Sequence, residues 1–239
     1  IQNCLKLNVI NQSIYKIYLL NERIYSNEEL GIESEKICQI NIGKRLSYKD
    51  IFDIVEEKNI EGYIVACNSD IFFDASVLDI KKTPISKEKR ILSSLRYEYN
   101  KTPLKNCKLF GPRSDSQDSW IFHSNQNIPK NLRHIFDISL GIPGCDNRLL
   151  YLFNLLGYYC HNEPKLIKSY HYQLTRKRNY DQNTAKIPAP WIAILPKLDD
   201  SDIMDQNHPF NIIDENINFY NYIKEKIDKN ENFVIPRIA

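Results

Sequence analysis

The sequence predicts an α/β protein whose mainly parallel central sheet is flanked by helices. Short apolar runs rich in β-branched and aromatic residues alternate with a stretch of helical periodicity, which is typical of strands that alternate with helices. The apolar run 62–67 has the character of a strand that is buried on both faces. Polar residues follow it at once, and the strand ends of an open α/β sheet are where such proteins bind ligands.

The first half of the chain is expected to read helix, strand, strand, helix, strand. Ser47 is a good N-cap residue, and Asp50 lies in the first turn of the helix that follows it. Gly43 and Gly62 are suited to the turns on either side of this helix. The expected elements are a helix at 1–11, strands at 14–20 and 37–42, a helix at 48–58 and a strand at 62–67.

The second half is expected to add shorter strands and one apolar helix. The glycine-rich turn 141–147 leads into that helix, Asp146 stands where an N-cap would, and Gly157 ends it. Residues 1–198 are expected to form one domain, followed by a tail at 199–239. The expected elements are helical turns at 75–80, strands at 90–97 and 120–122, a helix at 148–156, short strands at 158–160 and 166–170, a loop at 177–186 and a tail helix at 214–228.

The composition is that of a globular protein. Of 239 residues, 42% are hydrophobic and 11% aromatic, which is ample for a packed core. The 32 basic and 30 acidic side chains leave a net charge of +2 without a long run of either sign, so we expect no nucleic-acid partner. The six cysteines form no CxxC pair, which favours reduced thiols and a cytoplasmic location. No stretch approaches the roughly 20 apolar residues of a membrane span.

Four polar residues are candidates for chemistry because each follows an apolar run or begins a helix: Asp70, Asp118, Asp146 and His171. In an α/β sheet such positions converge on one edge, so residues far apart in sequence can share a cleft. Carboxylate oxygen and imidazole nitrogen suit Mn²⁺ or Mg²⁺ when phosphate oxygens complete the shell. The alternative is that each residue only caps a turn or a helix, and spacing alone leaves this open.

Four short motifs in a fixed order carry a resemblance to a known family. They are Asn68-Ser69-Asp70-Ile71 with Asp74, the segment Ser116 to Phe122, the turn Gly141 to Asn147, and Tyr170-His171 followed by Arg176, Arg178 and Tyr180. Together they resemble glycosyltransferases of the GT-A fold, and are similar to small bacterial, algal and viral glycosyltransferase-like proteins. The resemblance runs from about Leu5 to Pro196 and implies a GT-A-like (Rossmann-like) domain.

The resemblance implies a metal-dependent reaction. In that family a divalent cation neutralises the diphosphate of a nucleoside-diphosphate sugar, because the leaving nucleoside diphosphate gains charge as the glycosidic bond breaks. Asp70 matches the last acid of the family's Asp-x-Asp motif, and His171 matches a histidine on the same ion, Mn²⁺ or Mg²⁺. Asn68 stands at the first acidic position, so weaker or water-mediated metal binding is implied. A structural histidine bonded to a carbonyl is the alternative for His171.

Asp146 matches the acid that serves as general base toward the acceptor hydroxyl in inverting members of the family. At a helix N-terminus its carboxylate is expected to stay ionised, with lowered basicity. Asp118 is expected to hold sugar hydroxyls and is the second candidate for the base. For Asp146 the alternative is a plain helix cap.

The resemblance also implies contacts to the donor nucleotide-sugar. Arg45 and Asn68 are expected to lie against the donor, and Glu22 to contact its nucleoside. Arg176 and Arg178, in the loop after His171, are expected to clamp the diphosphate and close over it. Solvated loop arginines are the alternative for this last pair.

The family's fold begins with a strand whose following loop touches the nucleotide base, whereas this chain opens on the expected helix 1–11. We therefore expect the first strand to be missing from this sequence and to belong to a larger parent polypeptide. The expected partners are a nucleotide-sugar donor and a glycan or protein acceptor, and a homodimer is a further expectation.

Three functional hypotheses follow. The first is a metal-dependent glycosyltransferase that moves a sugar onto a hydroxyl, with inversion if Asp146 is the base, although a retaining mechanism stays open. The second is a non-catalytic carbohydrate-binding or assembly module on the same fold, motivated by Asn68 and by the missing strand. The third is a phosphoryl-transfer or hydrolytic metalloenzyme that uses the same Asp and His residues.

Overall fold

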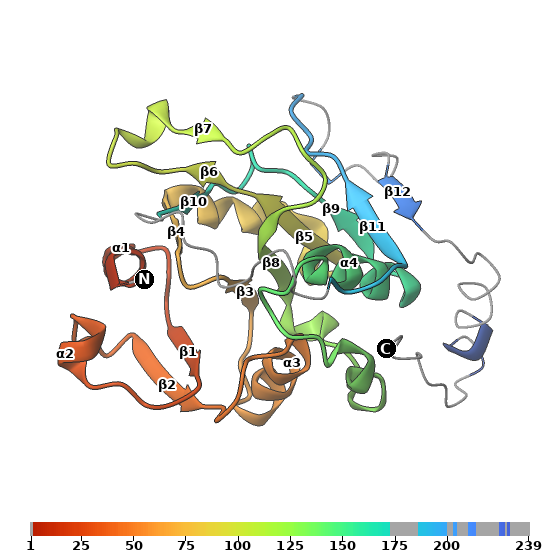
Figure 1. Cartoon of the computed structure of the whole chain (residues 1–239), viewed down its shortest axis with the longest axis horizontal. Coiled ribbons are helices and arrows are strands. Elements are labelled where there is room, and N and C mark those ends of the chain that lie inside the picture. The colour runs from red at the N-terminus through yellow and green to blue at the C-terminus, as the bar shows by residue number, and fades with distance from the viewer. Residues whose placement is uncertain are drawn as a thin grey trace.

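The computed structural model describes residues 2–172, 186–199, 203–204, 210–213, 225–227 and 229, and has a mixed α/β architecture (Figure 1). The helices are α1 (Gln2–Ile10), α2 (Asn27–Leu30), α3 (Tyr48–Glu57) and α4 (Cys145–Leu155), with 3-10 turns η1 (Ala75–Lys82), η2 (Pro84–Ser86), η3 (Leu104–Asn106), η4 (Ser124–Gln126) and η5 (Lys130–Phe136). The strands are β1 (Ile17–Asn21), β2 (Ile37–Asn41), β3 (Tyr63–Cys67), β4 (Ile71–Phe73), β5 (Arg90–Leu95), β6 (Tyr97–Glu98), β7 (Lys108–Leu109), β8 (Gln117–His123), β9 (Tyr159–His161), β10 (Ser169–His171), β11 (Trp191–Ile194) and β12 (Phe210–Ile213).

The central sheet has the strand order β3-β8-β5-β9. Strand β8 runs antiparallel to both β3 and β5, whereas β5 and β9 are parallel. The mixed α/β class is thus confirmed, but the structure does not show the mainly parallel central sheet that the sequence predicts. The connection between β5 and β8 explains this difference. After β5 the chain passes through β6 and β7 and returns to the same end of the central sheet, so β8 runs antiparallel to β5.

A second four-stranded sheet, of order β4-β10-β6-β7, extends from the central one. Strand β4 follows β3 after a short turn, and β6 follows β5 after a single residue, Arg96. Between them lies β10, antiparallel to β4 and parallel to β6. The second sheet therefore continues from the carboxyl ends of β3 and β5, and β10 brings a distant part of the chain to this place.

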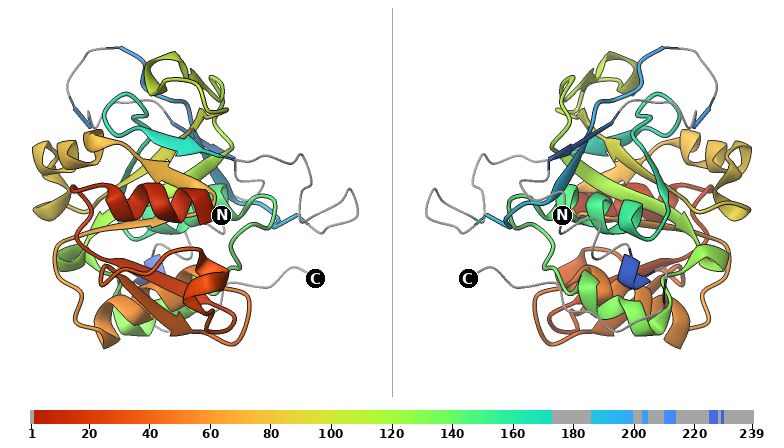
Figure 2. Two further views of the ribbon diagram at one scale, coloured as in Figure 1. Left: turned by 90° about the vertical axis from the view of Figure 1, so that its left-hand side faces the viewer. Right: turned by 90° about the vertical axis from the view of Figure 1, so that its right-hand side faces the viewer.

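Helix α1 packs against β4, as Figures 1 and 2 show from different sides. The Asn8 side chain donates to the carbonyl of Ile71 at 3.0 Å and accepts from the N–H of Phe73 at 3.1 Å. These bonds satisfy backbone groups on the side of β4 where none of the described strands pairs. They fix the segment that follows Asp70.

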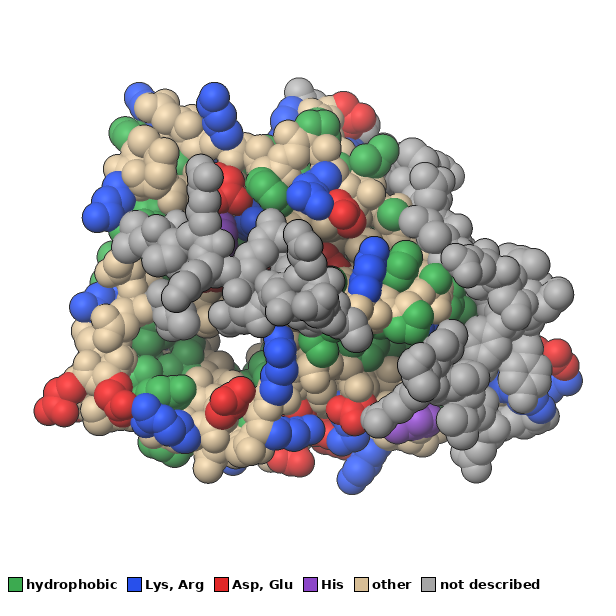
Figure 3. Space-filling view, viewed as in Figure 1, with side chains coloured by type: hydrophobic (Ala, Val, Ile, Leu, Met, Phe, Trp, Pro, Cys, Tyr) green, Lys and Arg blue, Asp and Glu red, His purple; other side chains and the backbone are tan. Residues whose placement is uncertain are grey.

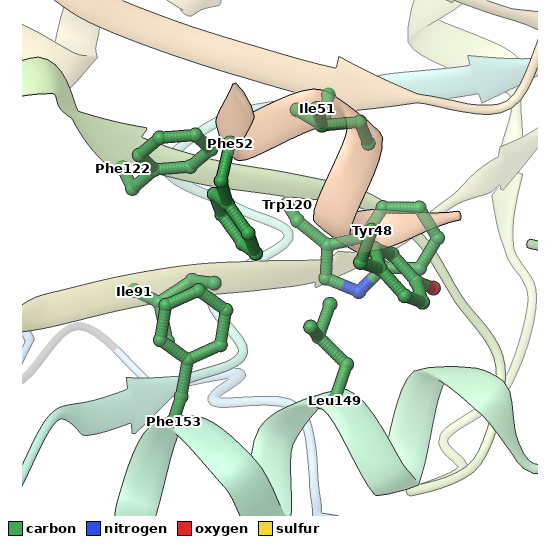
Figure 4. Close-up of a pocket in the computed structure, with 9 residues that line it drawn as sticks. Tyr48, Ile51, Phe52, Ile91, Trp120, Phe122, Leu149 and Phe153 are labelled. Atoms are coloured by element: carbon green, nitrogen blue, oxygen red, sulfur yellow. The ribbon is translucent and has the colours of Figure 1, made fainter. Parts of the chain in front are cut away.

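The main core lies between α3, the central sheet and α4. Phe52 meets Phe122, Phe136 and Phe153 edge-on, with ring centroids 5.5, 5.1 and 5.8 Å apart. Figure 4 shows side chains from α3, β5, β8 and α4 pointing into one small apolar space. Burying each such aromatic side chain stabilises the fold by about 1.5–3 kcal/mol. All the side chains that line this space are aromatic or aliphatic, so it is part of the core.

Most expected elements of the first half are confirmed. Ser47 caps α3 in a capping box, in which its hydroxyl accepts from the N–H of Asp50 and the Asp50 carboxylate accepts from the N–H of Ser47. The N-cap of α4, however, is Gly144, at a φ of 85°, so Asp146 lies inside the first turn and is not the cap. The expected loop 177–186 lies outside the described residues except for Lys186. The tail helix 214–228 also lies outside them except for 225–227, which are helical.

Strands β1 and β3 lie at the ends of their described sheets. Among the described strands, β1 pairs only with β2, in parallel, and β3 pairs only with β8. The side chains of β1 and β3 are half-buried along their whole length, whereas those of β5 are buried. No helix in the described part of the chain has the length and apolar character needed to cross a membrane.

Candidate functional site

The direction of β8 brings two predicted residues together. Asn68 follows the carboxyl end of β3, and Asp118 lies at the amino end of β8; because the strands are antiparallel, these two ends meet at one edge. The Asn68 side-chain Nδ2 donates to Asp118 Oδ1 at 2.8 Å, and its backbone N–H donates to the Asp118 carbonyl at 3.1 Å. In a parallel arrangement Asp118 would have lain at the opposite edge of the sheet.

The second sheet adds His171 and Asp70. In the register of β10, His171 lies between Ile71 of β4 and Glu98 of β6. Its Nε2 lies 3.2 Å from Asp70 Oδ2, and its Nδ1 lies 3.1 Å from Glu98 Oε2. The imidazole is therefore held between two carboxylates, one on each ring nitrogen.

Arg96 links these pairs into one network. Its Nε donates to Glu98 Oε1 at 2.9 Å, and its Nη1 forms an ion pair with Asp118 Oδ2. We call the six connected residues the edge network: Asn68, Asp70, Arg96, Glu98, Asp118 and His171. Figure 3 shows acidic, basic and histidine side chains gathered near β6 and β10 on this face.

The oppositely charged side chains of the edge network shift one another's pKa values toward the ionised forms. Burial alone would raise the pKa of Asp70, but the hydrogen bond and charge of His171 bring it below its usual value. Burial would likewise lower the pKa of His171, yet its bonds to Asp70 and Glu98 raise it to about 9. In the metal-free site the two carboxylates therefore favour the charged form of the ring.

Asp146 adjoins the edge network through the first residue of β8. Its Oδ2 accepts from the N–H of Gln117 at 3.2 Å, and its Oδ1 accepts from the N–H of Asn147 at 3.0 Å. Burial, with a smaller contribution from the charge of Asp118, raises the pKa of Asp146 to about 6 despite these two donors. The expectation of lowered basicity at the helix N-terminus is thus wrong, because desolvation outweighs the first-turn amides.

Asp118 is less suited to accept a proton than Asp146. Burial raises the pKa of Asp118, and the Arg96 charge opposes this. Both of its carboxylate oxygens already accept bonds, one from Asn68 and one from Arg96. Among the described residues Asp146 accepts from backbone N–H groups, one on each oxygen, whereas Asp118 is also held by the charge of Arg96.

The Asp70 and His171 pair fits two neighbouring ligands of one small cation. Ligands at right angles on an ion with bonds of about 2.1 Å lie about 3 Å apart. The Oδ2 to Nε2 separation here is 3.2 Å, and the Asp70 side chain is 31% exposed. Across the described residues, no group of three or more His, Cys, Asp and Glu side chains is placed to hold a metal ion. Further ligands would then come from substrate phosphates and water.

The other expected donor contacts are only partly placed near this edge. Arg45 is exposed, and its Nε donates to the Leu140 carbonyl at 3.0 Å, so it lies on the turn that leads to Asp146. A side chain at Gly141 would come within 3.1 Å of this guanidinium. Glu22 is exposed on the loop after β1, and no interaction between described residues ties it to the edge network. Arg176 and Arg178 lie outside the described residues.

Sequence reasoning missed Arg96 and Glu98. Both directly follow the buried strand β5, where alternate residues share a face, so a charged pair two residues apart was a usable signal. Their connection to His171 depends on pairing between β6 and β10, which no local pattern shows.

Comparison of the chain with protein-family models, curated proteins and solved structures found no match.

Proposed function

We propose that this protein is a metal-dependent glycosyltransferase that moves a sugar from a nucleoside-diphosphate sugar to a hydroxyl of a glycan or protein. The main support is the convergence on one sheet edge of the Asp70 and His171 pair with Asp146, a half-buried carboxylate. The proposal includes a GT-A-like fold, which is supported by the common direction of β3, β5 and β9.

In this proposal each residue has a defined task. Asp70 and His171 hold Mn²⁺ or Mg²⁺, which when bound supplies positive charge against the leaving nucleoside diphosphate. Asp146 accepts the proton of the acceptor hydroxyl, and a base with a pKa of about 6 is ionised yet still basic at neutral pH. Displacement with inversion follows when that hydroxyl attacks from the side opposite the leaving group. Asp118, fixed by two donors, orients sugar hydroxyls.

In this proposal the structure explains why an asparagine, and not an acid, stands at position 68. Its amide donates to Asp118, and a carboxylate at the same position would face Asp118 with a second negative charge. The missing acid of the Asp-x-Asp motif therefore does not by itself indicate a loss of catalysis. The missing acid also motivates a second candidate function, a non-catalytic carbohydrate-binding module. The turnover experiment below distinguishes this module from the enzyme.

The test is turnover of a panel of nucleotide-sugars with Mn²⁺, followed as release of the nucleoside diphosphate and of the sugar. We expect turnover by the natural chain and a loss of about 10²-fold or more in Asp70→Ala, because one electrostatic contact to the developing charge is worth that much. Asp79→Ala is the matched control, since Asp79 pairs with Lys82 on η1 outside the edge network.

Three other outcomes contradict the proposal. Binding of a donor without turnover by any variant would indicate the carbohydrate-binding module. Release of inorganic phosphate without sugar transfer would indicate phosphoryl-transfer or hydrolytic chemistry. Absence of both binding and turnover with every donor would sink the enzyme hypothesis as a whole.

A further inference from the structure

Glu98 is held in a single geometry from both sides. The backbone is fixed because the N–H of Tyr99 donates to the His171 carbonyl at 2.9 Å, which continues the parallel pairing of β6 and β10. Each carboxylate oxygen then has its own partner: Oε2 meets His171 Nδ1, and Oε1 accepts from Arg96 Nε. Two bonds on two oxygens fix the plane of the carboxylate.

Arg96 is itself anchored. Its guanidinium lies over the ring of Phe110, 4.2 Å from the centroid, and pairs with Asp118. Only 13% of its side chain is exposed, whereas 44% of the Glu98 side chain is. The buried arginine therefore holds a half-exposed carboxylate against His171, and the support runs from the central sheet to the second one.

On the opposite side of the ring, His171 Nε2 faces Asp70. The Asp70 carbonyl accepts from the N–H of Tyr172 at 2.9 Å, so the backbone of the Asp70 turn is tied to the end of β10. With Nδ1 committed to Glu98, only Nε2 can serve a ligand on the Asp70 side. A cation that binds there displaces the Nε2 proton to solvent, and the ring then keeps its proton on Nδ1 and presents the Nε2 lone pair.

We propose that Glu98, anchored by Arg96, is a positioning residue that sets the tautomer and orientation of His171 for metal binding with Asp70. This inference rests on the metal-dependent part of the proposed function. Carboxylates that accept the second N–H of a metal-bound histidine fix the ring and raise its basicity, and their loss lowers metal affinity about 10–100-fold. Glu98 is placed for that task although it would not touch the ion.

The experiment measures binding of Mn²⁺ alone, as the loss of the free-ion signal in electron paramagnetic resonance. The variants are Glu98→Gln, which keeps an acceptor oxygen for Nδ1–H, and Glu98→Ala, which removes it. Glu56→Gln is the matched control, because Glu56 is also half-exposed and pairs with a buried arginine, Arg133, far from His171. We expect affinity to fall about 10–100-fold in Glu98→Ala, less in Glu98→Gln and not at all in Glu56→Gln.

A second readout separates positioning from simple stabilisation. In the Mg²⁺-loaded protein, ¹⁵N spectra of the imidazole report which nitrogen of His171 carries the proton. We expect Nδ1–H in the natural chain and, in Glu98→Ala, an additional share of rings that carry the proton on Nε2 and have not bound the ion. Because Glu98→Gln retains the acceptor and is the milder change, it provides the answer if Glu98→Ala does not fold.

The outcomes distinguish this inference from the proposed function. If the natural chain binds Mn²⁺, Asp70→Ala abolishes binding and Glu98→Gln and Glu98→Ala bind as the natural chain does, the positioning role is wrong while the metal site stands. If the natural chain binds no Mn²⁺ and no nucleotide-sugar, both are wrong. Equal losses in Glu98→Gln and Glu56→Gln would also contradict the inference, since they would reflect general destabilisation.

Discussion

Arg133 is nearly fully buried and joins two parts of the fold. Its Nη1 pairs with Asp53 and Glu56 of α3, and its Nε donates to the carbonyl of Ile128 at 2.8 Å. Arg96 also pairs with two carboxylates, but its partners have a different setting. Glu98 continues to His171, and Asp118 continues to Asn68, whereas the partners of Arg133 lie on α3, where Asp53 also pairs with Lys49.

The comparison shows that a buried arginine between two carboxylates does not by itself indicate function. Both clusters satisfy charges that would be costly to bury alone. They differ in what the carboxylates touch next: in one case the surface of a helix, in the other a histidine, an amide and the neighbourhood of Asp146. Three predictions test whether this difference separates a structural clamp from a working site.

The largest difference is expected at Asp146. Asp146→Asn removes the proposed base and should lower turnover by about 10²–10⁴-fold, with little change in donor binding. In the natural chain the rate should fall by about tenfold per pH unit below a pH of about 6, because protonation of a base with a raised pKa leaves no acceptor for the proton. Steady-state kinetics over pH 5–8 check both points, and a pH-independent rate would exclude Asp146 as the base.

Replacement of each of the two arginines by methionine should separate an effect on folding stability from an effect on metal binding. Arg133→Met leaves Glu56 without this partner and Asp53 with Lys49, and should lower the free energy of unfolding by about 2–3 kcal/mol, less than for a fully buried pair, without changing Mn²⁺ binding. Arg96→Met should cost stability as well, and should also weaken Mn²⁺ binding by releasing Glu98. Urea unfolding and Mn²⁺ titration of both variants make the comparison. Equal Mn²⁺ affinities in the two would erase the distinction.

A smaller effect is expected for Asn68→Asp. The change removes the amide donor to Asp118 and should lower the free energy of unfolding by about 1–2 kcal/mol. Burial already raises the pKa of Asp118, and a second carboxylate would raise it further. Stability lost to repulsion between ionised groups grows as pH rises, so the deficit should be larger at pH 8 than at pH 5. A constant deficit across this range would show that the two side chains do not face each other.

Local signals predicted much of the fold. Ser47 and Asp50 predict the start of α3, and the glycine-rich turn predicts α4 to within a few residues, because caps and apolar spacing act within one turn. The same kind of signal was present but overlooked at α2, where Ser26 and Glu29 form a capping box. Strand pairing was not predictable in this way, since the direction of β8 depends on the path of the chain through β6 and β7.

The residues of the site also divide into those that a local sequence signal marks and those that depend on strand pairing. Asp70, Asp118, Asp146 and His171 could be selected because each stands beside an apolar run or at a helix start. Glu98 and Arg96 could not be assigned a role, because their meaning arises only when residues 71, 98 and 171 become neighbours in the second sheet. The basicity of Asp146 was misjudged for a related reason: desolvation is set by the packed surroundings, which a helix position does not reveal.

Among the described strands β3 pairs on one side alone, which has a consequence of its own. The N–H of Asn68 donates to the Asp118 carbonyl and the Gly62 carbonyl accepts from the N–H of Ser124, just past β8, and in an antiparallel pair such bonded positions recur at every second residue. The N–H groups of Tyr63, Val65 and Cys67 therefore point away from β8. These three N–H groups are spaced as hydrogen-bond donors along a strand edge are. They would therefore fix the register of a further strand that paired with this side of β3.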